Sequence, residues 1–178
     1  MEANTVIFKW NPAISSVSML DFLRCILQEE ADSDWSVWDH ERIRRGDTVY
    51  MLKVGYGQTG IVMRGKITSD PAAGEDWSGR GRQVFYCRYR ADIMINPDAF
   101  PLLDGVTLRD NIPGFDWFGG HSGTVPDEKQ SEVLARMWEN YLTENKAEFR
   151  SRLDLIERRG MWNDQLYISP RFRTILDQ

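Results

Sequence analysis

Alternating apolar and polar residues predict three strands in the middle of the chain, over 48–54, 61–69 and 83–95. In the last of these, the odd-numbered positions are apolar or aromatic: Phe85, Cys87, Tyr89, Ala91 and Ile93. Its even-numbered positions are mostly polar: Tyr86, Arg88, Arg90 and Asp92. Such strands have one buried face and one solvated, basic face. A further strand is predicted at 5–9, before Asn11 and Pro12.

Apolar residues at helical spacing predict helices on both sides of these strands. Leu20, Leu23 and Leu27 indicate a helix over 17–28, which Ser15 or Ser16 can cap. A second apolar stripe, which includes Trp138 as a packing residue, indicates a helix over 127–143. A third helix is predicted over 146–158, whereas 35–45 is expected to be irregular and 102–116 mainly loop. The pattern therefore predicts an α+β fold, a small mixed β-barrel flanked by helices.

Length and composition are those of one domain with helical additions. The 178 residues leave little room for two independent cores. We expect a domain over 1–145 and a C-terminal helical extension over 146–178 that packs on it. With no apolar run of about 18 residues and no signal peptide, we expect a cytoplasmic protein without a membrane partner. Cys25 and Cys87 are expected to be reduced.

The formal net charge of −5 is unevenly distributed. Residues 37–96 hold ten basic and seven acidic side chains, and the rest of the chain is strongly acidic. The charge argues mildly against a large non-specific nucleic-acid surface but permits a local basic patch. Candidate phosphate contacts in this region, which are equally well explained as a solvated face with ion pairs, are Arg42, Arg44, Arg45, Arg64, Lys66, Arg88 and Arg90.

No motif in the chain carries a catalytic constellation. Residues 55–60 match the pattern GxGxxG, but a strand-like segment follows where a dinucleotide site requires a helix, so we interpret the glycines as a hairpin connection. His121 and Ser122 are adjacent and lack the context of a nucleophile elbow. Two distant His and two distant Cys do not make a zinc site. We therefore expect a non-catalytic protein without a cofactor or metal.

An unusual supply of aromatic residues is the strongest indication of function: 7 Trp, 8 Phe and 6 Tyr. Many of them follow strand ends or lie in loops, where rings can reach a ligand. Each stack between a base and an aromatic ring is worth about 1–3 kcal/mol, against a few kcal/mol to unstack a base from a duplex. The candidate rings and the polar groups that could bind a base edge are Trp10, Asn11, Trp35, Trp38, Tyr56, Gln58, Thr59, Trp117, Phe118 and Ser122.

The order of these segments resembles the EVE domain family, which belongs to the PUA-like group with YTH, ASCH and SRA domains. The resemblance rests on residues 9–12 (KWNP), 45–52 (RGDTVYML) and 60–71 (GIVMRGKITSDP), and covers roughly 6–142. It implies a small barrel flanked by helices and a pocket for a base, often a modified one. The matching pocket positions are Trp10, Asn11, Trp38 and 56–59.

The leading hypothesis is therefore a module that binds a modified base in DNA or RNA. The expected context is a bacterial restriction or modification system, or an RNA-modification system, in which a separate effector protein would supply the chemistry. A small-molecule sensor or protein-interaction adaptor that uses the same pocket is the alternative. An enzyme acting on nucleic acid is the third hypothesis.

Overall fold

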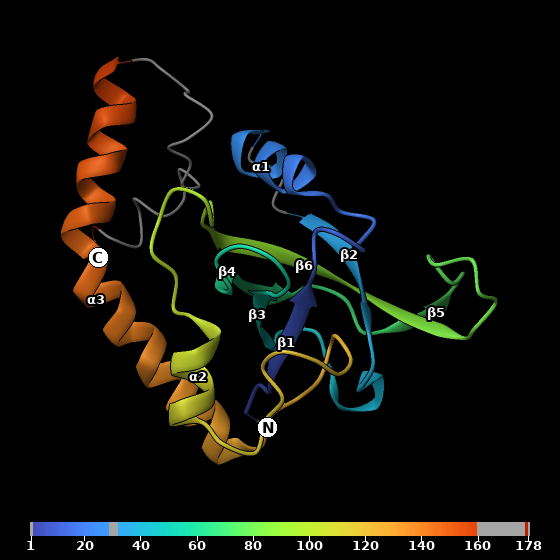
Figure 1. The fold of residues 1–178 in the computed structure, drawn as a ribbon. Coiled ribbons are helices and arrows are strands. Elements are labelled where there is room, and N and C mark those ends of the chain that lie inside the picture. The colour runs from blue at the N-terminus through green and yellow to red at the C-terminus, as the bar shows by residue number, and fades with distance from the viewer. Residues whose placement is uncertain (1, 29–31, 160–176, 178) are drawn as a thin grey trace.

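The computed structural model describes residues 2–28, 32–159 and 177, and within them a mixed, curled sheet packs with three helices (Figure 1). The sheet follows the order β1-β3-β4-β6-β2, and the short β5 pairs with β6. Only the β1–β3 pair is parallel. The strands are β1 (Thr5–Trp10), β2 (Asp32–Val37), β3 (Thr48–Lys53), β4 (Gly60–Ile67), β5 (Ala72–Gly74) and β6 (Val84–Met94).

The segment 122–125 joins the two edges of this sheet. On one side, the Ile7 N–H donates to the Thr124 carbonyl at 2.9 Å, and the Gly123 N–H donates back to the Ile7 carbonyl at 2.9 Å. On the other side, the Trp38 N–H donates to the Ser122 carbonyl at 3.0 Å, just after β2 ends. The curled sheet is thereby closed into a barrel-like body between β1 and β2.

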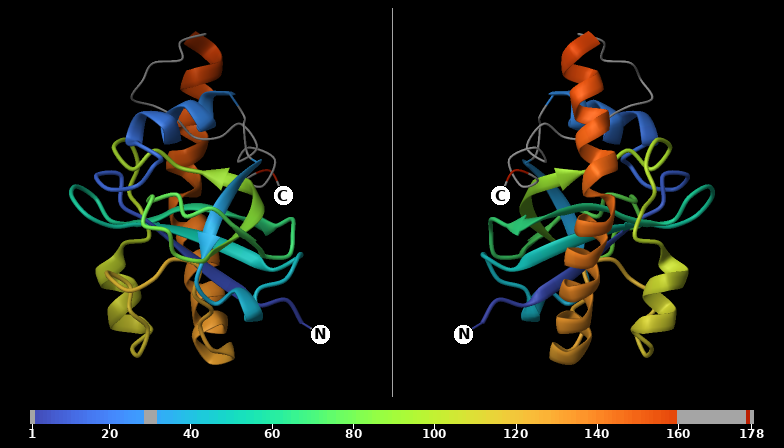
Figure 2. Two further views of the ribbon diagram at one scale, coloured as in Figure 1. Left: turned by 90° about the vertical axis from the view of Figure 1, so that its right-hand side faces the viewer. Right: turned by 90° about the vertical axis from the view of Figure 1, so that its left-hand side faces the viewer.

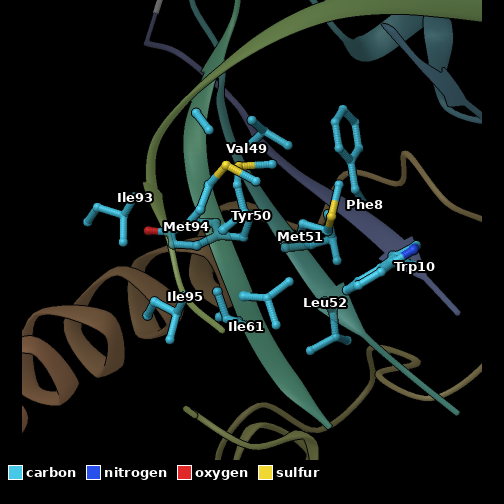
Figure 3. Close-up of a cluster of buried hydrophobic side chains, with 14 of the residues drawn as sticks. Phe8, Trp10, Val49, Tyr50, Met51, Leu52, Ile61, Ile93, Met94 and Ile95 are labelled. Atoms are coloured by element: carbon cyan, nitrogen blue, oxygen red, sulfur yellow. The ribbon is translucent and has the colours of Figure 1, made fainter. Parts of the chain in front are cut away.

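Three rings from three strands meet on the inner face of the curl. Phe8 of β1 stacks on Trp35 of β2 with 5.7 Å between ring centroids, and both rings contact Tyr89 of β6 edge to face. Figure 3 shows Phe8 and Trp10 beside the side chains of β3. Because Val6, Phe8 and Trp10 alternate with Ile7 and Lys9, they share one face of β1.

Three helices cover this body, apart from a short 3-10 turn, η1 (His40–Arg42). Helix α1 (Met19–Gln28) packs Phe22 on the Trp10 ring at 4.6 Å. Helix α2 (Gly105–Asn111) is capped by Asp104, whose carboxylate accepts from the Thr107 N–H. Helix α3 (Glu128–Arg159) runs along one side of the sheet (Figure 2). None of the helices in the described part of the chain has the length and apolar character needed to span a membrane.

The structure confirms the α+β class and corrects several predicted elements. The 83–95 strand is confirmed, with Cys87, Tyr89, Ala91 and Ile93 buried and Arg88 and Arg90 exposed. The hairpin interpretation of 55–60 is also confirmed, since β3 and β4 pair antiparallel across it.

Three local predictions were wrong. Residues 32–37 form β2, although 35–45 was expected to be irregular, and 105–111 form α2 in a predicted loop. The two helices predicted over 127–143 and 146–158 are one continuous helix, α3, which crosses the proposed boundary at residue 145. The later part of the predicted extension, 160–176, lies outside the described residues.

Candidate functional site

A small cavity lies between α1 and the inner face of the sheet. Its volume is about 30 Å³, which is room for about two water molecules. Its walls come from α1 and the segment before it, and from β2, β3 and β6. Most of the lining is apolar or aromatic, and the lining residues are Val17, Phe22, Cys25, Ser33, Trp35, Met51, Tyr89, Ala91 and Met94.

Two rings give this cavity walls of different orientation. Trp35 and Tyr89 stand at 83° to each other with centroids 6.4 Å apart. Phe8 backs Trp35 from the other side, so the indole ring is held in place. The Trp35 indole N–H donates to the Ser122 hydroxyl at 2.9 Å. Trp35 therefore offers a ligand its ring face, because its one polar donor is already used.

The polar groups of the cavity are few and uncharged. Burial raises the pKa of Tyr89, whose hydroxyl has a hydrogen bond with the Ser33 side chain. The phenol is therefore neutral at every physiological pH. An apolar cavity with three aromatic rings and a pair of hydroxyl groups suits a planar, uncharged ligand.

The structure does not assemble the pocket that the sequence predicted. Trp10 is 0% exposed, and its indole N–H donates to the Val17 carbonyl at 2.7 Å. Trp117 is 2% exposed and donates to the Ile112 carbonyl at 3.0 Å. Trp38, by contrast, lies on the surface. Within the described residues, two of these rings are therefore buried in separate places and the third is exposed, and among the ten predicted pocket residues only Trp35 lines the cavity beneath α1.

The predicted base-edge residues have structural partners. The Gln58 side-chain amide donates to the Pro97 and Phe100 carbonyls, and its oxygen accepts from the Leu102 N–H. Ser122 Oγ accepts from the Lys9 N–H as well as from Trp35. Asn11 Oδ1 accepts from the Ala13 N–H within a turn. These groups hold loops and the barrel closure, and they lie outside the cavity lining.

The loop over 55–60 is organised around a buried cation. Lys53 is 1% exposed, and its ammonium donates to the Tyr56 and Gln58 carbonyls at 2.5 and 3.0 Å. Burial lowers the pKa of Lys53. The Tyr56 ring lies 5.2 Å from the ammonium but is itself exposed, and Thr59 is half-buried. Tyr56 and Thr59 are therefore displayed near this loop, away from the cavity.

Two histidine stacks lie near the end of β2. His121 stacks on Trp38 with centroids 3.6 Å apart and planes at 3°. His40 stacks on Phe85, also at 3.6 Å. Phe118, from the same loop as His121, is exposed with the Arg109 guanidinium 5.7 Å from its ring. Trp38 and Phe118 are thus surface rings, held by neighbours of the chain itself.

The candidate phosphate contacts fall into separate places. Arg64 is half-buried, beside Tyr50 under α3, and its buried Nε has no partner among the described residues. The Arg42 guanidinium donates to the Val125 carbonyl. Lys66, Arg88 and Arg90 are exposed on the outer face of the sheet. The remaining two, Arg44 and Arg45, are exposed in the turn before β3.

Sequence reasoning found one cavity residue and missed the others. The residues that it missed as site residues include Phe22 and Cys25 of α1 and Tyr89 of β6. A signal for Tyr89 was present, because the alternation had placed it on the buried face of its strand. No group of His, Cys, Asp and Glu within the described residues is arranged to hold a metal ion.

Comparisons with known proteins show a shared fold. No family model and no curated protein matches the chain. A hypothetical protein from Leishmania major is similar in structure, with a TM-score of 0.54, 12% identity, and coverage of 79% of this chain and 97% of that protein. A Pseudomonas syringae protein has a TM-score of 0.49 at 14% identity, covering 75% and 99%. The YTH domain of Mmi1, solved in complex with RNA, has a TM-score of 0.47 at 12% identity, covering 82% of each chain.

Proposed function

We propose that this chain is a nucleic-acid-binding module of the EVE type that receives one base, with or without a modification, in the cavity beneath α1. The observation that carries the proposal is the pairing of the Trp35 and Tyr89 rings at 83° within an apolar cavity. One ring can stack on the face of a heterocycle while the other contacts its edge. The role is binding, and any chemistry belongs to a separate effector protein.

The character of the lining favours an uncharged base with an apolar substituent. Methyl groups placed against Met51, Met94 or Ala91 would be buried among apolar atoms. Each buried CH₂ or CH₃ contributes about 0.8 kcal/mol. The Tyr89 hydroxyl and Ser33 offer hydrogen bonds to one edge of the ring. A cavity of this kind discriminates a methylated base from its parent mainly through burial.

A base needs more room than the cavity has. At about 30 Å³ the cavity is filled by two water molecules, so α1 must move away from the sheet when a base enters. Phe22 and Cys25 are the residues of α1 that line the cavity, and Phe22 also packs on Trp10. We therefore propose α1 as the movable wall, with β2, β3 and β6 as the fixed one.

A thermal-shift series with cytidine, adenosine and their methylated forms tests this site. A nucleoside at ten times its Kd adds about 1.4 kcal/mol to the free energy of unfolding, which raises the Tm by about 3–6 °C in a chain of this size. Cys25→Leu places a larger side chain in the cavity and should abolish the shift. Arg24→Leu, an exposed neighbour on the same helix, is the matched control and should keep it.

The comparison uses the shift that ligand produces in each variant, because Cys25→Leu can alter the starting Tm by overpacking. Loss of the shift in Cys25→Leu alone would support the cavity. Equal shifts in Cys25→Leu and Arg24→Leu would place the ligand elsewhere. A wild-type protein that responds to none of the nucleosides, and to no base presented in an oligonucleotide, would refute the proposal.

A sensor of free small molecules is the second candidate, because the cavity itself contains no cationic residue. A planar metabolite could occupy it without any phosphate contact. The salt dependence of binding separates the two functions, since affinity for a strand falls with salt through counterion release. Affinity for a free heterocycle that exceeds the affinity for any strand, and that is independent of salt, would favour the sensor.

A further inference from the structure

The outer face of β2 and β6 carries a second set of aromatic and cationic side chains. Since Trp35 points inward, the alternation of β2 places Asp34 and Ser36 outward. Their partners on β6 are Arg88 and Tyr86, and Lys66 of β4 lies directly across from Arg90. Trp38 comes directly after the last residue of β2, at the end of this face, and is 59% exposed.

Trp38 is exposed but rigidly held. His121 covers one face of its indole ring at 3.6 Å in a nearly parallel stack. The backbone on both sides is fixed, because the N–H groups of Trp38 and Asp39 donate to the Ser122 and Gly123 carbonyls at 3.0 and 2.9 Å. An aromatic ring whose orientation is already fixed loses little conformational entropy when a partner stacks on it. The free indole face is thus a prepared stacking surface.

The cations on this face have only weak partners within the chain, and the Lys66 ammonium donates to the Thr48 hydroxyl at 2.9 Å. Like charges that face each other across two strands are destabilising, and Lys66 and Arg90 are such a pair. Arg88 lies 3.7 Å from Asp34, but both side chains are more than 60% exposed, and surface pairs of this kind contribute little. Asp32 is the residue across from Arg90 on β2. An anion beside these cations would relieve the repulsion.

We propose that this outer face binds a single strand of nucleic acid, with one base stacked on Trp38 and the backbone phosphates beside Arg88, Arg90 and Lys66. The strand must be single, because the bases of a duplex are stacked within it and cannot present a free face to an exposed ring. Measured along β2 from Trp38 to Asp32, which pairs with Arg90, the face is about 20 Å long at roughly 3.4 Å per residue. This is enough for several nucleotides.

This proposal rests on the proposed function and names its substrate class. The residues that carry it lie outside the cavity, on the outer side of the sheet. The test is fluorescence anisotropy with labelled single-stranded DNA and RNA 12-mers, and with the corresponding duplexes. Trp38→Ala should weaken binding of the single strands by about 5- to 150-fold, the range expected for one lost base stack. Tyr56→Ala removes an equally exposed ring from the loop over 55–60 and should leave the affinity unchanged.

The phosphate contacts are tested by salt. A face with three cations should give a slope of about −2 in a plot of log affinity against log salt, and Arg88→Gln should reduce that slope by about 0.7. An unchanged slope would remove Arg88 from the contact. Single-strand affinity in Trp38→Ala within twofold of the wild type would overturn the stacking site, and so would a duplex bound as tightly as the single strand.

These outcomes separate the two proposals. Circular dichroism first checks that Trp38→Ala is folded, and His121→Ala, which leaves the indole in place but unsupported, provides a second variant with an intermediate loss expected. If Cys25→Leu abolishes the nucleoside response while Trp38→Ala leaves oligonucleotide binding intact, the cavity stands and the outer face is refuted. If Trp38→Ala weakens oligonucleotide binding, no nucleoside binds, and Cys25→Leu leaves oligonucleotide binding unchanged, the outer face stands and the cavity is refuted.

Discussion

Replacement of Gly123 by alanine tests the closure of the barrel. Gly123 has φ +75°, where an alanine costs about 1–2 kcal/mol. A Cβ there would also lie 2.4 Å from the Val37 Cα and 2.7 Å from its Cγ1. Segment 122–125 and the end of β2 cannot move apart without lengthening the hydrogen bonds that the Trp38 and Asp39 N–H groups donate to this segment. Overpacking of this kind costs about 1–3 kcal/mol, so we expect a total loss of about 2–5 kcal/mol in the free energy of unfolding.

Gly79 provides the matched control. Its φ is +72°, and an added Cβ would have nothing within 4 Å. Gly79→Ala should therefore show only the backbone strain, and the gain from a less flexible unfolded chain is the same in both variants. Urea denaturation followed by tryptophan fluorescence gives both values. Equal losses in Gly123→Ala and Gly79→Ala would show that segment 122–125 does not pack against β2 as the structure has it.

Two further predictions concern Cys87 and Gln58, which do not line the cavity. Burial raises the pKa of the Cys87 thiol to about 12. A thiol reagent such as DTNB at pH 8 should therefore react only with Cys25 in the folded protein. Rapid reaction of two thiols would contradict this. Because the folded state keeps a proton that the unfolded chain releases, the free energy of unfolding should fall as the pH rises above 9.0. Gln58→Ala removes three hydrogen bonds and should lower the free energy of unfolding by about 1–3 kcal/mol, with an unchanged thermal response to nucleosides; a lost response in a stable variant would restore Gln58 as a base-edge residue.

The strands could be predicted where side chains alternate strongly, and only there. β6 has five inward positions that are apolar or aromatic, and it was found almost to the residue. β2 was missed because its sequence begins Asp-Ser-Asp, residues that rarely favour strands. Its position at the edge of the sheet, paired with β6 alone among the strands, is set by tertiary contacts that no local pattern encodes.

The helices show the same limit. The Asp104 carboxylate caps α2 through Thr107, a signal that was visible in the sequence, but the helix has only seven residues. In place of α3 the sequence predicted two helices, over 127–143 and 146–158, that divide near Thr143 and Asn145. Both side chains instead donate to carbonyls one turn earlier, at Glu139 and Tyr141, and the helix continues. Phe149 and Leu153 extend the buried stripe beyond it.

The candidate rings were harder to assign because a tryptophan at a strand end can face either way. Trp10 has the same parity as Val6 and Phe8, so the alternation of β1 already placed it inside. Trp117 is different: its indole N–H reaches the end of α2 at Ile112, and without α2 no partner could be foreseen. The sequence therefore predicted which rings lie near loops, but it did not predict that the Trp117 ring is buried.

The barrel closure gives a physical reason why binding on the two faces of β2 should be coupled. The Ser122 hydroxyl accepts from the Trp35 indole N–H and its carbonyl accepts from the Trp38 backbone N–H, so one residue contacts the inward ring and the backbone that carries the outward ring. In the two proposals, a base that enters the cavity contacts Trp35 and a base on the outer face stacks on Trp38, three residues further along the chain. Movement of either ring must be accommodated at Ser122 or at Gly123, which packs directly on Val37. We therefore expect a strand bound on the outer face to stabilise the closed position of this segment, and with it the Trp35 ring in the fixed wall of the cavity.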